Sequence, residues 1–120
     1  MIDVETYREY CLSKPGVTES CPFGPDTLVF KVMNKMFALT NLASFEFINL
    51  KCEPERAQEL RDQHEAIRPG YHMNKQHWNS VYMDGTLPDQ LIYELIDHSY
   101  ELIVDSLPKK LKEEWKDLKR

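Results

Sequence analysis

The chain has 120 residues, of which 42% are hydrophobic and 29% are charged, and its formal net charge is −5 at pH 7. These values are typical of one soluble globular domain, which we expect to span residues 1–120. No apolar run approaches the roughly 20 residues of a membrane span, and no basic-then-apolar leader opens the chain, so we expect a cytoplasmic monomer that does not contact membranes.

The charge and the cysteines exclude further classes. An acidic chain is a poor general binder of nucleic acid, because phosphate contacts need local positive potential, so such a site must be a local patch. Three cysteines, Cys11, Cys21 and Cys52, are odd in number and widely spaced. They favour neither a disulfide framework nor a zinc site, and we expect small thiols in a reducing compartment.

The N-terminal segment 3–13 has the pattern of a helix. Asp3 is a good capping residue, the apolar positions recur at helical spacing, and Lys14-Pro15-Gly16 ends the helix. Residues 18–23 are ambiguous and are compatible with a short edge strand, since Pro22 breaks any longer element.

Residues 27–33 and 36–41 predict a β-hairpin that turns at Asn34, a residue that tolerates positive φ. Either Met33-Asn34 or Asn34-Lys35 occupies the central positions. Both registers put Leu28, Phe30 and Val32 on one core face with Phe37 and Leu39, while Lys31 points outward and Lys35 lies at or beside the tip. The segment 27–45 contains no acid.

Residues 45–51 predict a third strand with apolar residues on both faces. Pro54 suits the first turn of a helix to about His64, anchored by Ala57, Leu60 and Ile67.

The stretch from Arg68 to Asp89 lies between two predicted helices and is the most distinctive part of the chain. It opens with a Pro-Gly turn and closes with an Asp-Gly turn, and residues 66–83 contain no acid. Within it, Trp78 to Met83 has β character, and we expect Trp78 to be core while Tyr71 and His72 are exposed.

Residues 88–106 give the strongest helical periodicity, with Thr86 as the predicted cap. One face is apolar (Leu91, Ile92, Leu95, Ile96, Ser99, Leu102, Ile103), and the opposite face carries Glu94, Asp97, Glu101 and Asp105. The acidic face reads as solvated, or as a surface for a basic partner or a cation. After Pro108, a short final helix repeats apolar residues at Leu111, Trp115 and Leu118.

Several blocks of the chain resemble the MmcQ/YjbR family, and together they span about residues 7–107. The most specific block is His72-Met73-Asn74-Lys75-Gln76-His77-Trp78-Asn79-Ser80-Val81-Tyr82, followed by Asp84-Gly85. Supporting blocks are Cys11-Leu12-Ser13-Lys14-Pro15-Gly16, Phe30-Lys31-Val32, Lys35-Met36-Phe37-Ala38 and Leu50-Lys51-Cys52-Glu53-Pro54-Glu55. The chain departs from the family at Asn34, where glycine is frequent, which leaves the geometry of the hairpin tip open.

The resemblance implies a small α+β domain in which helices pack on one face of an antiparallel sheet, in a CyaY-like or double-wing arrangement. The family carries a DNA-binding label that rests on likeness of fold, which is a weak basis for function. It supplies no catalytic residue to transfer.

The chemistry-bearing residues favour a non-enzymatic binding domain. His72 and His77 are five apart and have no carboxylate between them, so neither a metal nor another cofactor is expected. No nucleophile motif or phosphate-cradling glycine loop is present.

Two functions remain open. In the first, the two acid-free segments contact DNA phosphates weakly and without sequence preference, using Lys31, Lys35, Arg68 and Lys75, with His72 and His77 as further candidates. Four contacts predict a salt slope of about −3.6 on duplex DNA. In the second, the domain binds a protein partner or a small ligand, and the stretch from His72 to Trp78 is mainly structural.

Overall fold

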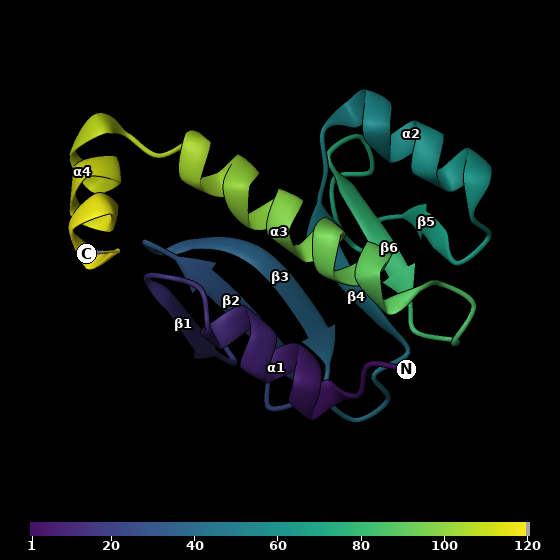
Figure 1. The fold of residues 1–120 in the computed structure, drawn as a ribbon. Coiled ribbons are helices and arrows are strands. Elements are labelled where there is room, and N and C mark those ends of the chain that lie inside the picture. Colours follow the sequence, from purple (N-terminus) through teal and green to yellow (C-terminus); the bar gives the residue numbers. More distant parts are fainter. Residues whose placement is uncertain (120) are drawn as a thin grey trace.

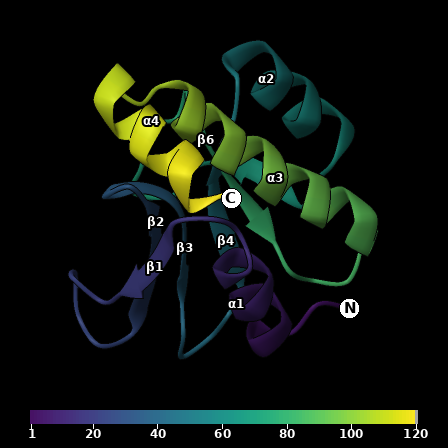
Figure 2. The same ribbon diagram turned by 60° about the vertical axis from the view of Figure 1, so that its left-hand side comes forward.

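The fold is one antiparallel sheet with helices on one of its faces, in a computed structural model that describes residues 1–119 (Figures 1 and 2). The strands are β1 (Val17–Ser20), β2 (Thr27–Val32), β3 (Lys35–Asn41), β4 (Phe47–Lys51), β5 (Ile67–Pro69) and β6 (Trp78–Tyr82). The helices are α1 (Val4–Leu12), α2 (Pro54–Gln63), α3 (Asp89–Asp105) and α4 (Lys109–Leu118). The strand order is β1-β2-β3-β4-β6-β5. The predicted α+β class is therefore confirmed, whereas the CyaY-like and double-wing descriptions stay predictions.

Two of the helix starts follow their predicted chemistry and one does not. Asp3 caps α1, since its carboxylate accepts the Thr6 amide at 2.8 Å, and Pro54 occupies the first turn of α2. The prediction that Thr86 caps α3 is wrong. The Thr86 hydroxyl instead donates to Asp84 at 2.6 Å, and Pro88 stands at the N-cap without a side-chain hydrogen bond.

The hairpin turns on Met33 and Asn34, whose φ angles are +49° and +68°, so the first of the two registers is correct. The prediction that Leu39 shares the core face with Phe37 is wrong. The register between β2 and β3 shifts after Phe30, and this bulge places both Phe37 and Ala38 in the core. Leu39 is consequently turned to the opposite face of the sheet.

The core lies between the sheet and the helices. α3 buries Ile92, Leu95, Ile96, Ser99, Tyr100, Ile103 and Val104, which confirms the predicted apolar stripe in its main part. Tyr7 of α1 packs edge-on against Phe30 with ring centroids 5.4 Å apart. It also contacts Phe45, at 5.6 Å, so Phe45 belongs to the helix side and does not share a face with Phe47. Phe45 has a φ of +46° in the turn before β4, and this turn breaks the strand alternation.

The cysteines are free, with Cys11 and Cys52 buried and Cys21 exposed. Burial raises the pKa of the Cys11 thiol to about 12 and also raises that of Cys52. Both buried thiols therefore stay protonated at neutral pH, as the interpretation of small packed thiols requires.

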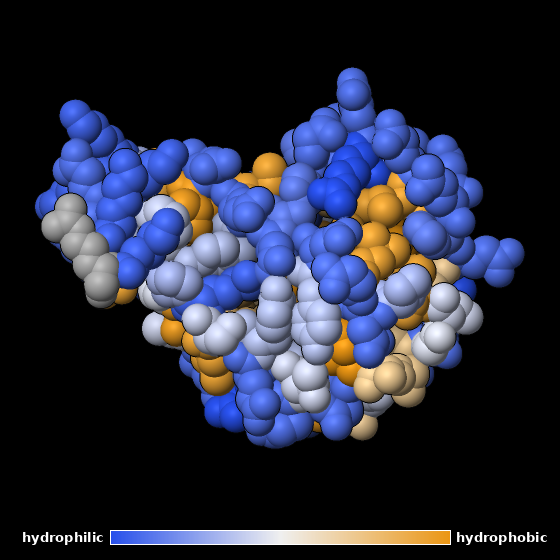
Figure 3. Space-filling model, in the orientation of Figure 1, coloured by the Kyte–Doolittle hydropathy of each residue, from blue (hydrophilic) through white to orange (hydrophobic). Residues whose placement is uncertain are grey.

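The acidic stripe of α3 is not uniformly solvated. Asp97 accepts hydrogen bonds from Tyr10 at 2.7 Å and from Lys14 at 2.5 Å, which ties α3 to the end of α1. Glu94, Glu101 and Asp105 are exposed. Polar side chains also dominate the helix-bearing side of the surface, and apolar atoms show mainly in the depressions between helices (Figure 3).

We found one segment that sequence patterns did not predict. Ile67, expected to anchor α2, instead begins β5, a three-residue edge strand that pairs with β6. Within residues 1–119, no helix combines the length and the apolar composition that crossing a membrane requires.

His98 of α3 predicts a pH-dependent stability. Its Nε2 accepts the Glu53 amide at 3.3 Å, which requires the neutral ring. Burial, and then the Arg56 charge, lower the His98 pKa below 6.5. Since the unfolded chain then binds the proton more readily, this stabilisation is complete above pH 6.5 and is lost as the pH falls from 6.5 through the lowered value. Urea unfolding between about pH 7.5 and 5.5 should show a steeper loss of stability for the parent than for His98→Gln. Parallel curves would contradict the assignment.

Candidate binding site on the uncovered face of the sheet

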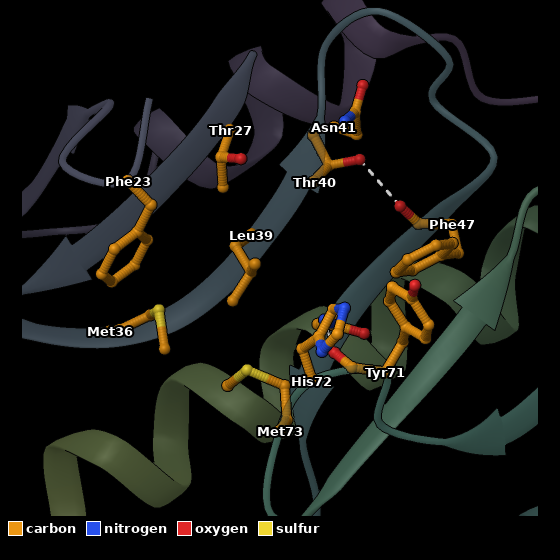
Figure 4. Close-up of a pocket in the computed structure, with 11 residues that line it drawn as sticks. Phe23, Thr27, Met36, Leu39, Thr40, Asn41, Phe47, Tyr71, His72 and Met73 are labelled. Carbon is orange, nitrogen blue, oxygen red and sulfur yellow. Dashed lines mark hydrogen bonds between the residues drawn. The ribbon is translucent and has the colours of Figure 1, made fainter. Parts of the chain in front are cut away.

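The face of the sheet opposite the helices, which we call the uncovered face, carries a groove of about 420 Å³. Strand alternation sends Leu28, Phe30 and Val32 into the core and leaves the intervening side chains of β2 on the uncovered face. The lining comprises Phe23, Thr27, Met36, Leu39, Thr40, Asn41, Phe47, Asn49, Tyr71, His72 and Met73 (Figure 4).

Two aromatic walls stand over an apolar floor. Phe23, in the loop between β1 and β2, is 70% exposed, and Tyr71, in the loop before β6, is 55% exposed. Figure 4 shows Phe23 on one side of Leu39 and Tyr71 with His72 on the other. Large apolar side chains left this exposed around a concavity are typical of a binding site.

The Tyr71 wall belongs to a loop, residues 70–77, that we call the flap. A polar cluster under the flap holds it against the sheet. The Ser80 hydroxyl donates to Asn49 Oδ1 at 2.5 Å and accepts the Tyr71 amide at 2.9 Å, and Asn49 Nδ2 donates to the Tyr71 carbonyl at 3.2 Å. Because Asn49 is only 2% exposed and Ser80 is fully buried, this cluster fixes the backbone at the groove.

Arg61 of α2 anchors the other side of the flap. Its guanidinium donates to Asn79 Oδ1 at 2.6 Å, to the Trp78 carbonyl at 3.2 Å and to the Lys75 carbonyl. The first residue of the flap is also bonded to the strand that follows it, since the Gly70 amide donates to the Trp78 carbonyl of β6 at 2.8 Å.

Gly70 is required by close packing. A Cβ at this position would lie 2.8 Å from the Trp78 Cβ and 2.9 Å from the Trp78 carbonyl oxygen. Trp78 is 9% exposed, so it is buried as predicted, but on the uncovered face of the sheet and beneath the flap.

A row of rings continues from the groove to the sheet edge. The Tyr71 ring lies 4.1 Å from His72 and 5.8 Å from Phe47, and Phe47 lies 5.1 Å from Tyr82. The guanidinium of Arg68 stacks over Tyr82, 4.5 Å from its centroid, a favourable cation–π geometry.

Three cations share this face with the groove. Lys31 is the cross-strand partner of Met36, Arg68 pairs with Ser80, and Lys51 follows Asn49 by two residues on β4. Among the strand residues of this face, within the part of the chain that the structure describes, there is no acid. The sheet face therefore has a positive character, although the whole chain is acidic.

The structure separates the predicted site residues into two groups. Lys31, Arg68 and His72 lie on the uncovered face. Lys35 is exposed beside the hairpin tip, and Lys75 folds back so that its Nζ donates to the Gly70 carbonyl at 2.9 Å.

His77 has a backbone role that no sequence pattern indicates, because its carbonyl accepts the Cys52 amide at 2.8 Å. Within residues 1–119, no three histidine, cysteine or acidic side chains gather as a metal site would need. We expect elemental analysis of the purified protein to find no stoichiometric zinc or iron.

Sequence reasoning missed Phe23, Lys51 and Arg61. Phe23 lies in a segment that proline and glycine made ambiguous. Lys51 had a usable signal, since alternation along its strand places it with Phe47 and Asn49. Arg61 had none, because its partners are remote in the sequence.

The chain is similar to proteins of several bacteria. A family model described as YjbR matches residues 12–102. The chain is 42% identical over 101 residues to the uncharacterized protein YjbR of Escherichia coli K12, covering 83% of this chain and 86% of that protein. It is 40% identical over 75 residues to the uncharacterized protein YyaQ of Bacillus subtilis, covering 62% of this chain and 63% of that protein.

Solved structures agree with this similarity. The crystal structure of Deinococcus radiodurans protein DR2400, with the family domain DUF419, superposes with a TM-score of 0.91 at 40% identity, covering 97% of this chain and 89% of that chain. A crystal structure of a Pseudomonas syringae protein gives a TM-score of 0.73 at 30% identity, covering 84% of this chain and 98% of that chain.

Proposed function

The chain belongs to the YjbR family, and we propose that it is a non-enzymatic domain that binds nucleic acid weakly and without sequence preference. The uncovered face of its sheet is the contact surface. The observation that carries the proposal is that Lys31, Lys51 and Arg68 lie on one sheet face whose strand residues, within residues 1–119, include no acid.

The distribution of charge supports this orientation. The acidic residues of α3 lie on the helix side of the sheet, so a polyanion on the uncovered face does not meet them (Figure 1). Asp26 and Glu46 are exposed in the loops next to β2 and β4. They limit the positive potential at one end of the groove, which is why the expected affinity is low.

The cations that meet phosphate differ from those expected on sequence grounds. Lys51 joins Lys31 and Arg68, because strand alternation places all three on one face. Lys35 is exposed beside the hairpin tip and is not counted among these three contacts. Lys75 contributes mainly to the flap, since its ammonium is already bonded to the Gly70 carbonyl.

Base-specific readout is not part of the proposal. Within residues 1–119, the contact surface consists of strands and loops, and it includes no helix that presents arginine or asparagine side chains to a major groove. Phosphate contacts position a protein on nucleic acid without reading its sequence.

Amide chemical shifts provide the direct test of the contact surface. We expect a single-stranded oligonucleotide of about ten residues, at low salt, to shift the amides of Met36, Leu39, Asn49 and Tyr71. A random-sequence duplex of equal length provides the comparison. Shifts confined to α4, or no shifts with either probe, would contradict the proposal.

A second candidate is a small-ligand module, favoured by the size of the groove. Its 420 Å³ falls within the roughly 300–1,000 Å³ of small-molecule sites. In this alternative, the cations orient an anionic ligand and the flap is a structural support. Groove shifts with a small aromatic anion, and none with either nucleic acid, would favour it.

A further inference from the structure

We propose that the groove accepts unpaired bases, so that the nucleic acid bound by this domain is single-stranded. This inference rests on the proposed function and adds the substrate class and the way in which it is held. It follows from the shape of the groove, the rigidity of one of its walls and the placement of the surrounding charges.

The groove has the form that a flat ring requires. Phe23 and Tyr71 face it from opposite sides, and Met36 and Leu39 form an apolar floor (Figure 4). Aromatic side chains stack on bases of any type, because every base has a π face. The lining therefore favours a planar heterocycle without requiring a particular sequence.

One wall is preorganised for this contact. Both the amide and the carbonyl of Tyr71 are bonded to the buried pair Ser80 and Asn49, and the Tyr71 ring packs against Phe47. A wall that is already ordered loses little conformational entropy when a ligand binds. Phe23, at 70% exposure, is the more weakly held partner.

The cations stand around the groove, where a strand's phosphates would pass. Lys31 and Lys51 lie towards the Met36 end, and Arg68 lies beyond the Phe47 and Tyr82 rings. A single strand that turns a base into the groove can therefore keep its backbone against positive charge. The phosphates of such a strand complement the Lys31, Lys51 and Arg68 charges, whereas an uncharged apolar peptide has no charge to offer them.

The same geometry discriminates against a duplex. Bases in a duplex are stacked on one another and expose only their edges, so they cannot place a ring face between Phe23 and Tyr71 without first being unstacked. Duplex DNA is left with the phosphate contacts alone.

The test separates base contacts from phosphate contacts. Fluorescence anisotropy at low salt compares an oligodeoxythymidine of about ten nucleotides with an abasic oligomer of the same phosphate number. We expect the thymidine oligomer to bind about ten-fold more tightly. Phe23→Ala should remove most of this difference and leave the abasic affinity unchanged. Leu42→Ala is the matched control, because Leu42 is also exposed, at 40%, and lies outside the groove lining.

The outcomes distinguish the two proposals. Equal binding of the two oligomers would overturn the base-binding groove and leave the phosphate-binding face intact. A preference for thymidine that Phe23→Ala does not change would also overturn the groove assignment. No binding of either oligomer would overturn both proposals.

Discussion

Replacing Arg61 with alanine is expected to lower the free energy of unfolding by about 3 kcal/mol, the largest effect on stability that we predict. The guanidinium bonds the Asn79 side chain and the carbonyls of Trp78 and Lys75. Asn79 is only 2% exposed, so the substitution leaves a buried amide oxygen without its charged donor. Such a loss costs more than the hydrogen bond itself.

Urea unfolding measures this effect, and Arg56→Ala is the matched control. Arg56 lies on the same helix and is likewise half-buried, but its guanidinium forms no hydrogen bond to residues 1–119. We expect the control to change stability by less than about 1 kcal/mol. In Arg61→Ala, the amides of Gly70 and Tyr71 should also exchange faster with solvent, because the flap is released. Equal stability of the two variants would show that Arg61 does not anchor the flap.

Local periodicity was sufficient to predict the elements that are long or sharply bounded. The stripe from Leu91 to Ile103 specified α3, and Asn34 specified the hairpin turn, because each signal is contained within the segment that it describes. The blocks shared with the YjbR family added the arrangement of helices on one sheet face.

The errors occurred where tertiary pairing overrode local alternation. The bulge at Phe37 and Ala38 reversed the face of Leu39, and nothing in the sequence marks a bulge without glycine. β5 has only three residues, too few to give a periodic signal, and it exists because β6 supplies its hydrogen-bond partners.

The groove itself was not predictable, since its walls come from segments far apart in the sequence. Phe23 and Tyr71 face the same cavity only because the sheet order places β4 beside β3 and β6 beside β4. Counting acid-free segments did select Lys31 and Arg68, which lie on the uncovered face. It also selected Lys75, whose inward turn depends on the Gly70 carbonyl and cannot be seen in charge patterns.

Removing the three cations of the uncovered face should have the largest effect on binding. We expect Lys31→Ala/Lys51→Ala/Arg68→Ala to weaken single-strand binding by about a hundred-fold at ~50 mM salt. A phosphate that is no longer contacted keeps its condensed counterions, so their release no longer favours binding. None of these three side chains is buried, since two are half-buried and one is exposed. Circular dichroism should therefore show an unchanged fold.

The matched control is Lys109→Ala/Lys110→Ala/Lys116→Ala on α4, whose side chains are exposed. α4 packs on the helix side, through the bond between Trp115 and Tyr100. Both triple variants remove three positive charges from a chain with net charge −5. Their comparison therefore separates the position of the charges from their number.

The salt dependence of oligodeoxythymidine binding tests the contact face most directly. For the parent and for the α4 variant, log K should fall against log salt with a slope of about −2, the value for three phosphate contacts on a single strand. The Lys31/Lys51/Arg68 variant should bind weakly and with a slope near zero. Equal slopes for all three proteins would contradict the assignment of nucleic-acid binding to the uncovered face of the sheet.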